Sequence, residues 1–425
     1  MQAGEPILLL CHSFPPIPGI GGRRWAKFAK ELANRGHPVH VIRSEQQAGS
    51  KASLWTDDVR HPLIIHHTIP ARFPAVMTRW PLTSLWDKLM YRAWLRILPL
   101  LTKGNYYDTA CLSRKDVLQK ASALIREHQI RHVIATGAPF HLLGYAAELK
   151  QAVPQLHLSI DFRDEWTWGR HYGFLTLPAR RLQVEKDLEA GVINTANTII
   201  SPHTVILDQL KQTYGAEGRK WAWIPHTIDP DDLPPPSPPR NDGVFRMVYA
   251  GNLYGTEQSE GYIPALLNAF SRIKERNPGL PPPCRLDLYI TGQGFQTFQQ
   301  EVLARGLGDL ILFHAPVPPK EVLARLAEAD LVPVFLPRDK KDVMVTKLSE
   351  LFCLRRPVLH IGEPGLVGRT IEEKHLGASL RVEELAEELP KIIRGERRIE
   401  VDASADHGEF LLPNVTDRLM AEVLS

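Results

Sequence analysis

Short runs of apolar residues alternate along the chain with longer segments in which apolar positions recur every three or four residues. The first run, at 7–11 (ILLLC), is followed by a loop rich in proline and glycine. In the next segment, 23–36, Trp25, Phe28 and Leu32 share one helical face. A second apolar run, VHVIR, comes directly after it. The pattern predicts a strand, a loop, a helix and a second strand.

The second half of the chain repeats this order. Residues 245–253 form an apolar run that ends in a glycine turn, 261–276 have helical spacing, and 285–294 contain the next apolar run. Further runs of the same kind lie at 131–139, 156–164, 197–204, 310–316, 329–337 and 356–362. Runs rich in Val, Ile and Leu without polar alternation are typical of parallel strands covered on both faces. The sequence therefore predicts an α/β protein with two Rossmann-like, doubly wound parallel-sheet domains.

A proline-rich stretch at 230–243 marks the middle of the chain. A chain of 425 residues exceeds what one hydrophobic core normally organises, so two domains are expected. Because proline removes backbone donors and disfavours helix, we interpret the stretch as a stiff linker between domains at 1–229 and 244–405. A long surface loop within one domain is the alternative. In two such domains, the cleft between them is the expected ligand site.

Composition and charge exclude several classes of protein. The formal net charge is +3 with 23% charged residues, which gives no case for a nucleic-acid partner. The four cysteines lie far apart without metal-ligand spacing, so a reducing, cytoplasmic location and no metal site are expected. No apolar run approaches the ~18 residues of a membrane-spanning helix, and the N-terminal residues lack the pattern of a signal peptide.

Residues 72–103 interrupt the alternation of strands and helices. This segment carries six Lys or Arg against one Asp, with Trp80, Trp86, Tyr91 and Trp94 between them. Mixed basic and aromatic residues at helical spacing fit a peripheral surface that rests on an anionic membrane. The alternative is an inserted helical hairpin whose aromatic residues pack on their own domain.

Two loops of the first half have residue types suited to a binding site. In one, Gly21 and Gly22 let the backbone approach a ligand, and the helix that begins near Arg23 turns free N–H groups toward an anion. A tight turn that needs glycine is the alternative. In the other, TGAPFH, His141 lies in the first turn of a predicted helix, where it faces the cleft or has a structural role.

The sequence DFRDE places four ionisable side chains at the carboxyl end of a predicted strand: Asp161, Arg163, Asp164 and Glu165. A carboxylate held there could act as a base toward a hydroxyl group. A salt-bridge cluster around Arg163 is the alternative.

A helix predicted to begin near Thr346 carries the features of a donor site in the second half. Its first turn, 345–348, would present backbone N–H groups to a diphosphate, and Lys347 would add positive charge. Glu350, one turn further along, could accept hydrogen bonds from sugar hydroxyls. Asp342 lies eight positions before Glu350.

These motifs resemble the retaining glycosyltransferases of family 4, which share the GT-B architecture of two Rossmann-like domains facing a cleft. FPPIPGIGGRRWAKFAKELANRGHPVHVI is similar to the family's N-terminal glycine loop and first helix. TGAPFHLLG followed by DFRDEW is similar to a subgroup associated with bacterial surface polysaccharide synthesis. YAGNLYG, ITGQG and TKLSELFCLRRPVL are similar to the donor-binding domain. The resemblance covers nearly the whole chain, and the last stretch is the most specific.

The resemblance implies roles for particular residues. The donor-binding residues are then Gly21, Gly22, Arg24, Gly251, Asn252, Gly292, Asp342, Val345, Thr346, Lys347 and Glu350. The family's two-glutamate signature falls on Asp342 and Glu350, so its first position departs from the family pattern. A basic element of the family is not evident in AGNLYGTEQSEG, and Lys347, or Lys340 and Lys341, would replace it. The catalytic candidates are Asp161, Arg163, Asp164 and His141, since Arg163 stands where many relatives have histidine.

A family member of this kind moves a sugar from a nucleoside-diphosphate sugar to an acceptor hydroxyl and retains the anomeric configuration. The resemblance implies no cofactor and no metal. The implied acceptor is a glycan or lipid-linked molecule of cell-surface polysaccharide or glycolipid synthesis, met in the cytoplasm or at the inner face of the membrane. The final helix, at 406–425, would return to the N-terminal domain.

Three other functions fit parts of the sequence. A nucleotide-sugar epimerase shares the implied fold but has no second substrate. A non-catalytic partner subunit of the same fold would explain Asp342 and the missing basic element. A nicotinamide-dependent oxidoreductase also has alternating strands and glycine turns, but the absence of G-x-G-x-x-G disfavours it.

Overall fold

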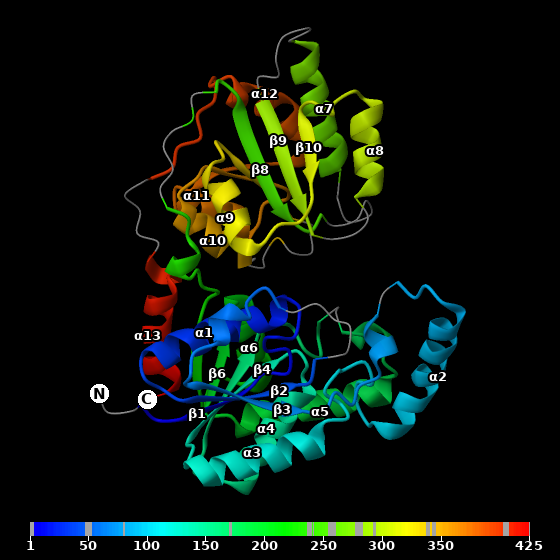
Figure 1. Ribbon diagram of the computed structural model, residues 1–425, viewed down its shortest axis with the longest axis vertical. Coiled ribbons are helices and arrows are strands. Elements are labelled where there is room, and N and C mark those ends of the chain that lie inside the picture. The colour runs from blue at the N-terminus through cyan, green and yellow to red at the C-terminus, as the bar shows by residue number, and fades with distance from the viewer. Residues whose placement is uncertain are drawn as a thin grey trace. The chain divides into compact units, whose positions relative to one another are not determined.

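The computed structural model divides the chain into two compact units (Figure 1). Unit 1 comprises Met1–His226 and Leu412–Ser425, and unit 2 comprises Thr227–Leu411. The structure describes residues 4–46, 53–79, 81–169, 172–235, 240, 242–253, 261–276, 284–291, 295–336, 341, 346–402 and 408–424, without the side chains of 346 and 347.

The crossings between the units differ from the predicted boundaries. The first lies at 226–227, before the prolines, and the described part of the predicted linker, including the short helix η5 (Pro230–Asp232), belongs to unit 2. The second lies at 411–412, later than the predicted 405. The prediction that the last helix returns to the N-terminal domain is confirmed, because α13 (Leu412–Val423) belongs to unit 1.

Unit 1 is built on a seven-stranded parallel sheet in the order β3-β2-β1-β4-β5-β6-β7. Its strands are β1 Ile7–Leu10, β2 Val39–Ser44, β3 Ile64–Ile69, β4 His132–Gly137, β5 His157–Phe162, β6 Thr198–Ser201 and β7 Lys220–Trp223. Its other α-helices are α1 Arg23–Asn34, α2 Leu85–Leu101, α3 Arg114–His128, α4 His141–Ala152, α5 Ala179–Thr195 and α6 Thr204–Tyr214. Short 3-10 helices are η1 Ile20–Gly22, η2 Asp57–Val59, η3 Ala75–Thr78 and η4 Phe174–Thr176.

The central strand β1 shows why these strands lack polar alternation. Successive side chains of a strand point to opposite faces of the sheet. Ile7 and Leu9 belong to one buried cluster, with α1 and α13, while Leu8 and Leu10 belong to another, with α3 and α4. Because helices cover both faces, every position of β1 is buried and apolar.

Unit 2 has two three-stranded parallel sheets, β10-β9-β8 and β11-β12-β13. The strands are β8 Phe245–Gly251, β9 Cys284–Ile290, β10 Ile311–His314, β11 Val332–Phe335, β12 Val358–Ile361 and β13 Gly377–Leu380. A parallel bridge between Met247 and Leu331 connects β8 to the start of β11, so both units follow the same winding order. The helices are α7 Tyr262–Glu275, α8 Gln296–Ala304, α9 Pro319–Ala327, α10 Thr346–Leu354, α11 Leu366–Glu373 and α12 Leu385–Ile393, with short η7 Val382–Glu384 and η8 Gly408–Phe410.

The predicted fold class is confirmed, and the strands that the sequence pattern did not predict are all at sheet edges. These are β3, β7 and β13, at the edges of their sheets. An edge strand is covered less completely, so its sequence includes polar residues: β3 reads IIHHTI and β7 reads KWAW. Because neither strand has a continuous apolar run, the sequence pattern does not distinguish either of them from a loop.

Candidate functional site

Arg163 holds together three loops at the carboxyl ends of the unit 1 strands. It follows β5, and its Nε donates to the carbonyl oxygen of Gly137, at the end of β4, over 3.1 Å. Its Nη1 and Nη2 donate to the carbonyl oxygens of Gly21 and Ala138. The guanidinium therefore contacts backbone carbonyls, and the predicted alternative of a salt bridge to its flanking aspartates is wrong. Arg163 positions the loops around a candidate ligand site.

Gly22 shapes the loop that leads from β1 into α1. A Cβ atom at this position would lie 2.2 Å from the carbonyl oxygen of Ser13, so only glycine fits without moving the backbone. The carbonyl of the neighbouring Gly21 is held by Arg163. The need for glycine at 22 is thus explained by close packing of the loop on itself. Donor binding by Gly21 and Gly22 stays a prediction.

Asp161 is fully buried and accepts hydrogen bonds on one carboxylate oxygen. Oδ2 lies 2.6 Å from Nε1 of Trp25 and 2.9 Å from Oγ1 of Thr136. Nε of Arg24 lies 3.4 Å from the same oxygen. These contacts join α1, β4 and β5 inside unit 1. Asp161 has the surroundings of a structural carboxylate, and its catalytic role stays a prediction.

Arg24 and Asp164 have different environments from each other. The guanidinium of Arg24 is buried and donates to the carbonyl oxygens of Ile224 and Pro225, both over 2.8 Å. It therefore stabilises unit 1, and its predicted contact with a donor would require it to leave these partners. Asp164 is half-buried, and its Oδ2 accepts from the hydroxyl of Tyr172 over 3.0 Å.

His141 is the first residue of α4 and forms a buried pair with Glu185. Its Nε2 lies 2.7 Å from Oε1 of Glu185, and the same oxygen accepts from the backbone N–H of Asn105. The other carboxylate oxygen, Oε2, accepts from Nε1 of Trp166. Asp108 accepts from the N–H of His141 and so caps the helix. Burial would lower the pKa of His141, but the two carboxylates outweigh burial and raise it. The raised pKa favours the protonated ring, and Nε2 is occupied by Glu185.

Three histidines at the carboxyl ends of strands were not among the predicted site residues: His12 after β1, His203 after β6 and His226 after β7. The rings of His203 and His226 lie 5.5 Å apart. Nδ1 of His203 has no hydrogen-bond partner within the described part of the chain. Position after a predicted strand could have indicated His12 and His203, whereas β7 itself was not predicted.

Desolvation keeps these rings neutral near pH 7. Burial lowers the pKa of His12 and of His203 to about 4, and lowers that of His226 well below its usual value. A neutral imidazole can accept a proton or a hydrogen bond, which suits a ring next to an acceptor hydroxyl.

The lowered histidine pKa values make stability depend on pH. Below about pH 6.5 the unfolded chain binds protons that the folded chain does not, so unit 1 is expected to lose stability as pH falls from 6.5 to 4. His12→Gln is expected to reduce that loss by about 1 to 2 kcal/mol. Urea unfolding at pH 7 and pH 4.5 measures both effects. His37→Gln, just before the amino end of β2, is the control. An equal loss of stability in His12→Gln and the parent would contradict the role given to His12.

Helix α10 confirms the prediction of a helix near Thr346. Leu348 and Phe352 are buried, and the ring of Phe352 lies 5.0 Å from that of Phe410. At about 100° per residue, Glu350 lies on the side of the helix away from these residues and one turn from Thr346. Because α10 follows β11 in a parallel sheet, its N-terminal turn is expected at the carboxyl end of that strand, and the backbone N–H groups of a first helical turn suit an anion.

Other predicted donor-binding residues are placed in part. Gly251 ends β8 with φ of 130°, a backbone conformation that favours glycine. The exposed Asn252 follows it, and its Oδ1 accepts from Oγ1 of Thr291 over 2.8 Å, at the end of β9. The predicted residues Gly292, Asp342, Val345 and Lys340 lie outside the described residues, as do the side chains of Thr346 and Lys347.

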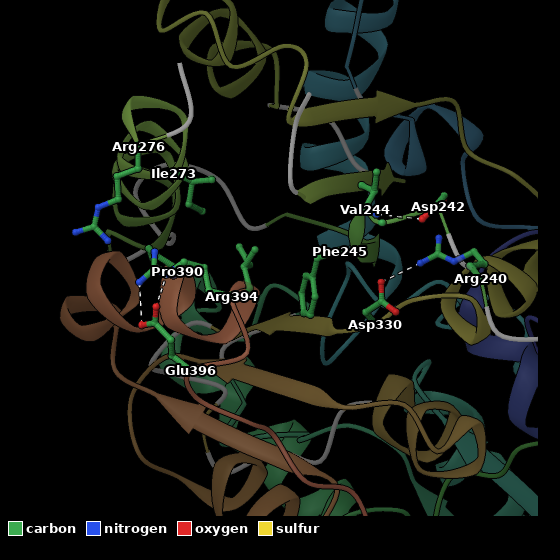
Figure 2. Close-up of a pocket in the computed structure, with 12 residues that line it drawn as sticks. Arg240, Asp242, Val244, Phe245, Ile273, Arg276, Asp330, Pro390, Arg394 and Glu396 are labelled. Atoms are coloured by element: carbon green, nitrogen blue, oxygen red, sulfur yellow. Dashed lines mark hydrogen bonds and ion pairs between the residues drawn. The ribbon is translucent and has the colours of Figure 1, made fainter. Parts of the chain in front are cut away.

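Unit 2 also has a cavity of about 1040 Å³ (Figure 2). It lies at the amino end of β8, whereas Gly251 and Asn252 lie at the carboxyl end. It is lined by Phe245, the first residue of β8, and by three arginines and three acidic residues. Arg240 pairs with Asp330 at 2.9 Å and Arg394 with Glu396 at 2.6 Å. Since its charges are largely paired with one another and it lies at the amino end of β8, this cavity is not the predicted donor site.

Comparisons with known proteins support the fold. No protein-family model matches the sequence, and no curated protein matches it. Among solved structures, the lipopolysaccharide outer core galactosyltransferase WaaB has 12% identity and a TM-score of 0.58, covering 99% of each chain. An α,α-trehalose-phosphate synthase from Burkholderia xenovorans, solved with glucose-6-phosphate, has 12% identity and a TM-score of 0.56, covering 99% of this chain and 100% of that one.

An epimerase is also similar. A UDP-N-acetylglucosamine 2-epimerase described as putative, from Listeria monocytogenes, has 12% identity and a TM-score of 0.57, covering 99% of this chain and 95% of that one. At such identities the likeness shows the shared two-domain GT-B fold. Transferases and an epimerase have that fold, so the choice between them rests on the site.

Within the described residues, no helix combines the length and the apolar character needed to cross a bilayer.

Proposed function

We propose that the protein is a glycosyltransferase that moves a sugar from a nucleoside-diphosphate sugar to an acceptor hydroxyl. The observation that carries the proposal is α10: it follows β11 in a parallel sheet, and Glu350 lies one turn beyond its start on the side away from the core. The backbone N–H groups of its first turn and the positive end of the helix dipole suit a diphosphate. Glu350 would accept hydrogen bonds from ribose or sugar hydroxyls.

Retention of configuration, independence from metal and membership of family 4 are parts of the same proposal, supported by the sequence resemblance. In this proposal unit 2 binds the nucleotide and unit 1 the acceptor. The leaving diphosphate gains negative charge in the transition state, and backbone N–H groups of α10 would stabilise it. His203 or Asp164, which follow the carboxyl ends of β6 and β5, would accept a hydrogen bond from the acceptor hydroxyl.

The cellular role is proposed on the same basis. The TGAPFHLLG and DFRDEW motifs favour synthesis of a cell-surface polysaccharide or glycolipid, with a glycan or lipid-linked acceptor. A lipid-linked acceptor would require the cytoplasmic protein to meet the inner face of the membrane. No cofactor is proposed beyond the nucleotide sugar as substrate.

A nucleotide panel tests the donor site. UDP, GDP, ADP, TDP and CDP, each with its sugar conjugates, are added to the purified protein, and unfolding is followed by circular dichroism. A ligand at 100 times its dissociation constant is expected to stabilise the native state by about 2.7 kcal/mol. All nine tryptophans lie before residue 227, so tryptophan fluorescence reports the unfolding of unit 1. A transition that circular dichroism detects and tryptophan fluorescence does not is therefore the unfolding of unit 2.

One nucleotide family is expected to stabilise the unit 2 transition. Stabilisation by none of them would contradict the proposal and favour a non-catalytic subunit. Conversion of the bound nucleotide sugar to its epimer without an acceptor, detected by NMR, would instead show an epimerase.

A further inference from the structure

Helix α2 presents an unusual number of apolar side chains to solvent. Among the described residues, half of the twelve large hydrophobic side chains that are exposed belong to this helix: Leu85, Trp86, Leu89, Ile97, Leu100 and Leu101. Leu85 and Leu100, near its two ends, are each 85% exposed. Such a concentration is typical of a surface that another apolar phase covers.

The helix has an inner face and an exposed outer face. At about 100° per residue, Leu98, which is buried, lies on one face with the half-buried Tyr91. Leu85, Leu89 and Leu100 lie together on the outer face. The alternative of a helical hairpin whose aromatic residues pack on their own domain does not fit Trp86, which is 67% exposed.

A row of basic residues runs along the same exposed side: at about 100° per residue Arg92 and Arg96 lie within about 20° of Leu85, so their long side chains flank the leucines. Lys88, Arg92 and Arg96 are four positions apart, so they form one ridge along the helix. All three are exposed, and none has an ion pair with a described residue. The helix has one acidic residue, Asp87, whose carboxylate accepts from the hydroxyl of Ser84 at the N-terminal end.

Helix α2 is anchored at its C-terminal end. Arg181, on α5, donates to the carbonyl oxygens of Pro99, Thr102 and Gly104. Figure 1 shows α2 at the periphery of unit 1, away from the central sheet. The anchor fixes the helix in place and leaves its outer face uncovered by the described parts of unit 1.

The positive charge of α2 favours an anionic bilayer over a second copy of the chain as the partner of this surface. A second copy of the chain, packing its α2 outer face on this one, would bring two basic rows near each other and would be opposed by repulsion. An anionic bilayer offers both an apolar interior and negative phosphates at its surface. An in-plane helix with an apolar face and a Lys/Arg-rich polar face binds at that boundary.

We infer that α2 lies in the plane of an anionic bilayer, with Leu85, Leu89 and Leu100 inserted below the headgroups and Lys88, Arg92 and Arg96 on the lipid phosphates. The inference names the membrane partner of the proposed transferase and rests on that function for its biological role. Vesicle binding itself is measured without any transfer reaction.

Sedimentation with lipid vesicles tests the inference. The full chain is expected to bind vesicles of phosphatidylcholine and phosphatidylglycerol and not vesicles of phosphatidylcholine alone. Reversal of the basic row, Lys88→Glu with Arg92→Glu and Arg96→Glu, is expected to weaken binding by at least about 100-fold, since each basic residue near an anionic surface contributes about fivefold. Leu85→Ser with Leu89→Ser and Leu100→Ser is expected to abolish it.

A matched control separates insertion of the α2 leucines into the bilayer from a general effect of exposed leucine side chains. Leu175 and Leu303 are 74% and 66% exposed on other elements, and replacing both by serine is expected to leave vesicle binding unchanged. Binding that survives both triple variants, or no binding by the parent, would overturn the inference. Self-association lost in the leucine triple variant, without vesicle binding, would show a second copy as the partner. Nucleotide stabilisation measured on the same variants shows independently whether the proposed function stands.

Discussion

Replacing Asp161 by alanine is expected to destabilise unit 1 by about 3 to 5 kcal/mol, because it leaves the Arg24 guanidinium buried without its charge partner. The same change removes the acceptor for Trp25 and Thr136, which lie 2.6 and 2.9 Å from the lost oxygen. Burial lowers the pKa of Arg24, and the Asp161 carboxylate opposes that shift. The buried guanidinium is therefore stabilised by Asp161, and removing the carboxylate leaves a buried charge without compensation.

Tryptophan fluorescence during urea unfolding measures the effect, because all nine tryptophans belong to unit 1. Asp161→Asn keeps an oxygen acceptor and loses the charge, so an intermediate loss is expected. Asp164→Ala is the control: it removes one hydrogen bond from the hydroxyl of the exposed Tyr172 and is expected to cost about 1 kcal/mol. A loss below 1 kcal/mol in Asp161→Ala would show that the network does not hold the loops.

Replacing Glu350 by alanine is expected to weaken nucleotide-sugar binding by about 10- to 100-fold. A hydrogen bond to a charged group contributes about 1.5 to 3 kcal/mol, and each 1.4 kcal/mol is tenfold in affinity. Because Glu350 lies on the side of α10 away from Leu348 and Phe352, the core contacts of the helix are kept. Isothermal titration with the nucleotide identified by the panel measures the loss.

Comparing the nucleotide with its sugar conjugate shows which part of the donor Glu350 contacts. Weaker binding of both the nucleotide and its sugar conjugate would place Glu350 on the ribose, and weaker binding of the conjugate alone would place it on the sugar. Glu373→Ala, at an exposed position of α11, is the control and is expected to bind as the parent does. Unchanged binding in Glu350→Ala would remove α10 from the donor site.

The two loops of unit 1 that were predicted from sequence have different explanations in the structure. Gly22 is required by the 2.2 Å approach to Ser13, a contact between residues nine positions apart in one loop. His141, in contrast, is held by Glu185, which lies on α5 and was not among the predicted site residues. Sequence spacing can indicate a tight loop, but not which distant carboxylate reaches a histidine.

The sequence by itself determined the fold class and the positions of the central strands along the chain, because a strand buried on both faces needs a continuous apolar run, as in ILLL at β1. It also indicated the helix at Thr346 and the basic, aromatic character of 72–103. Tertiary structure alone decided the roles of neighbouring residues: Asp161 is buried against Arg24 while Asp164, three positions later, is half-buried. It also decided that six large apolar side chains of α2 face solvent. Burial and partner choice depend on contacts between residues far apart in sequence, and local patterns do not contain those contacts.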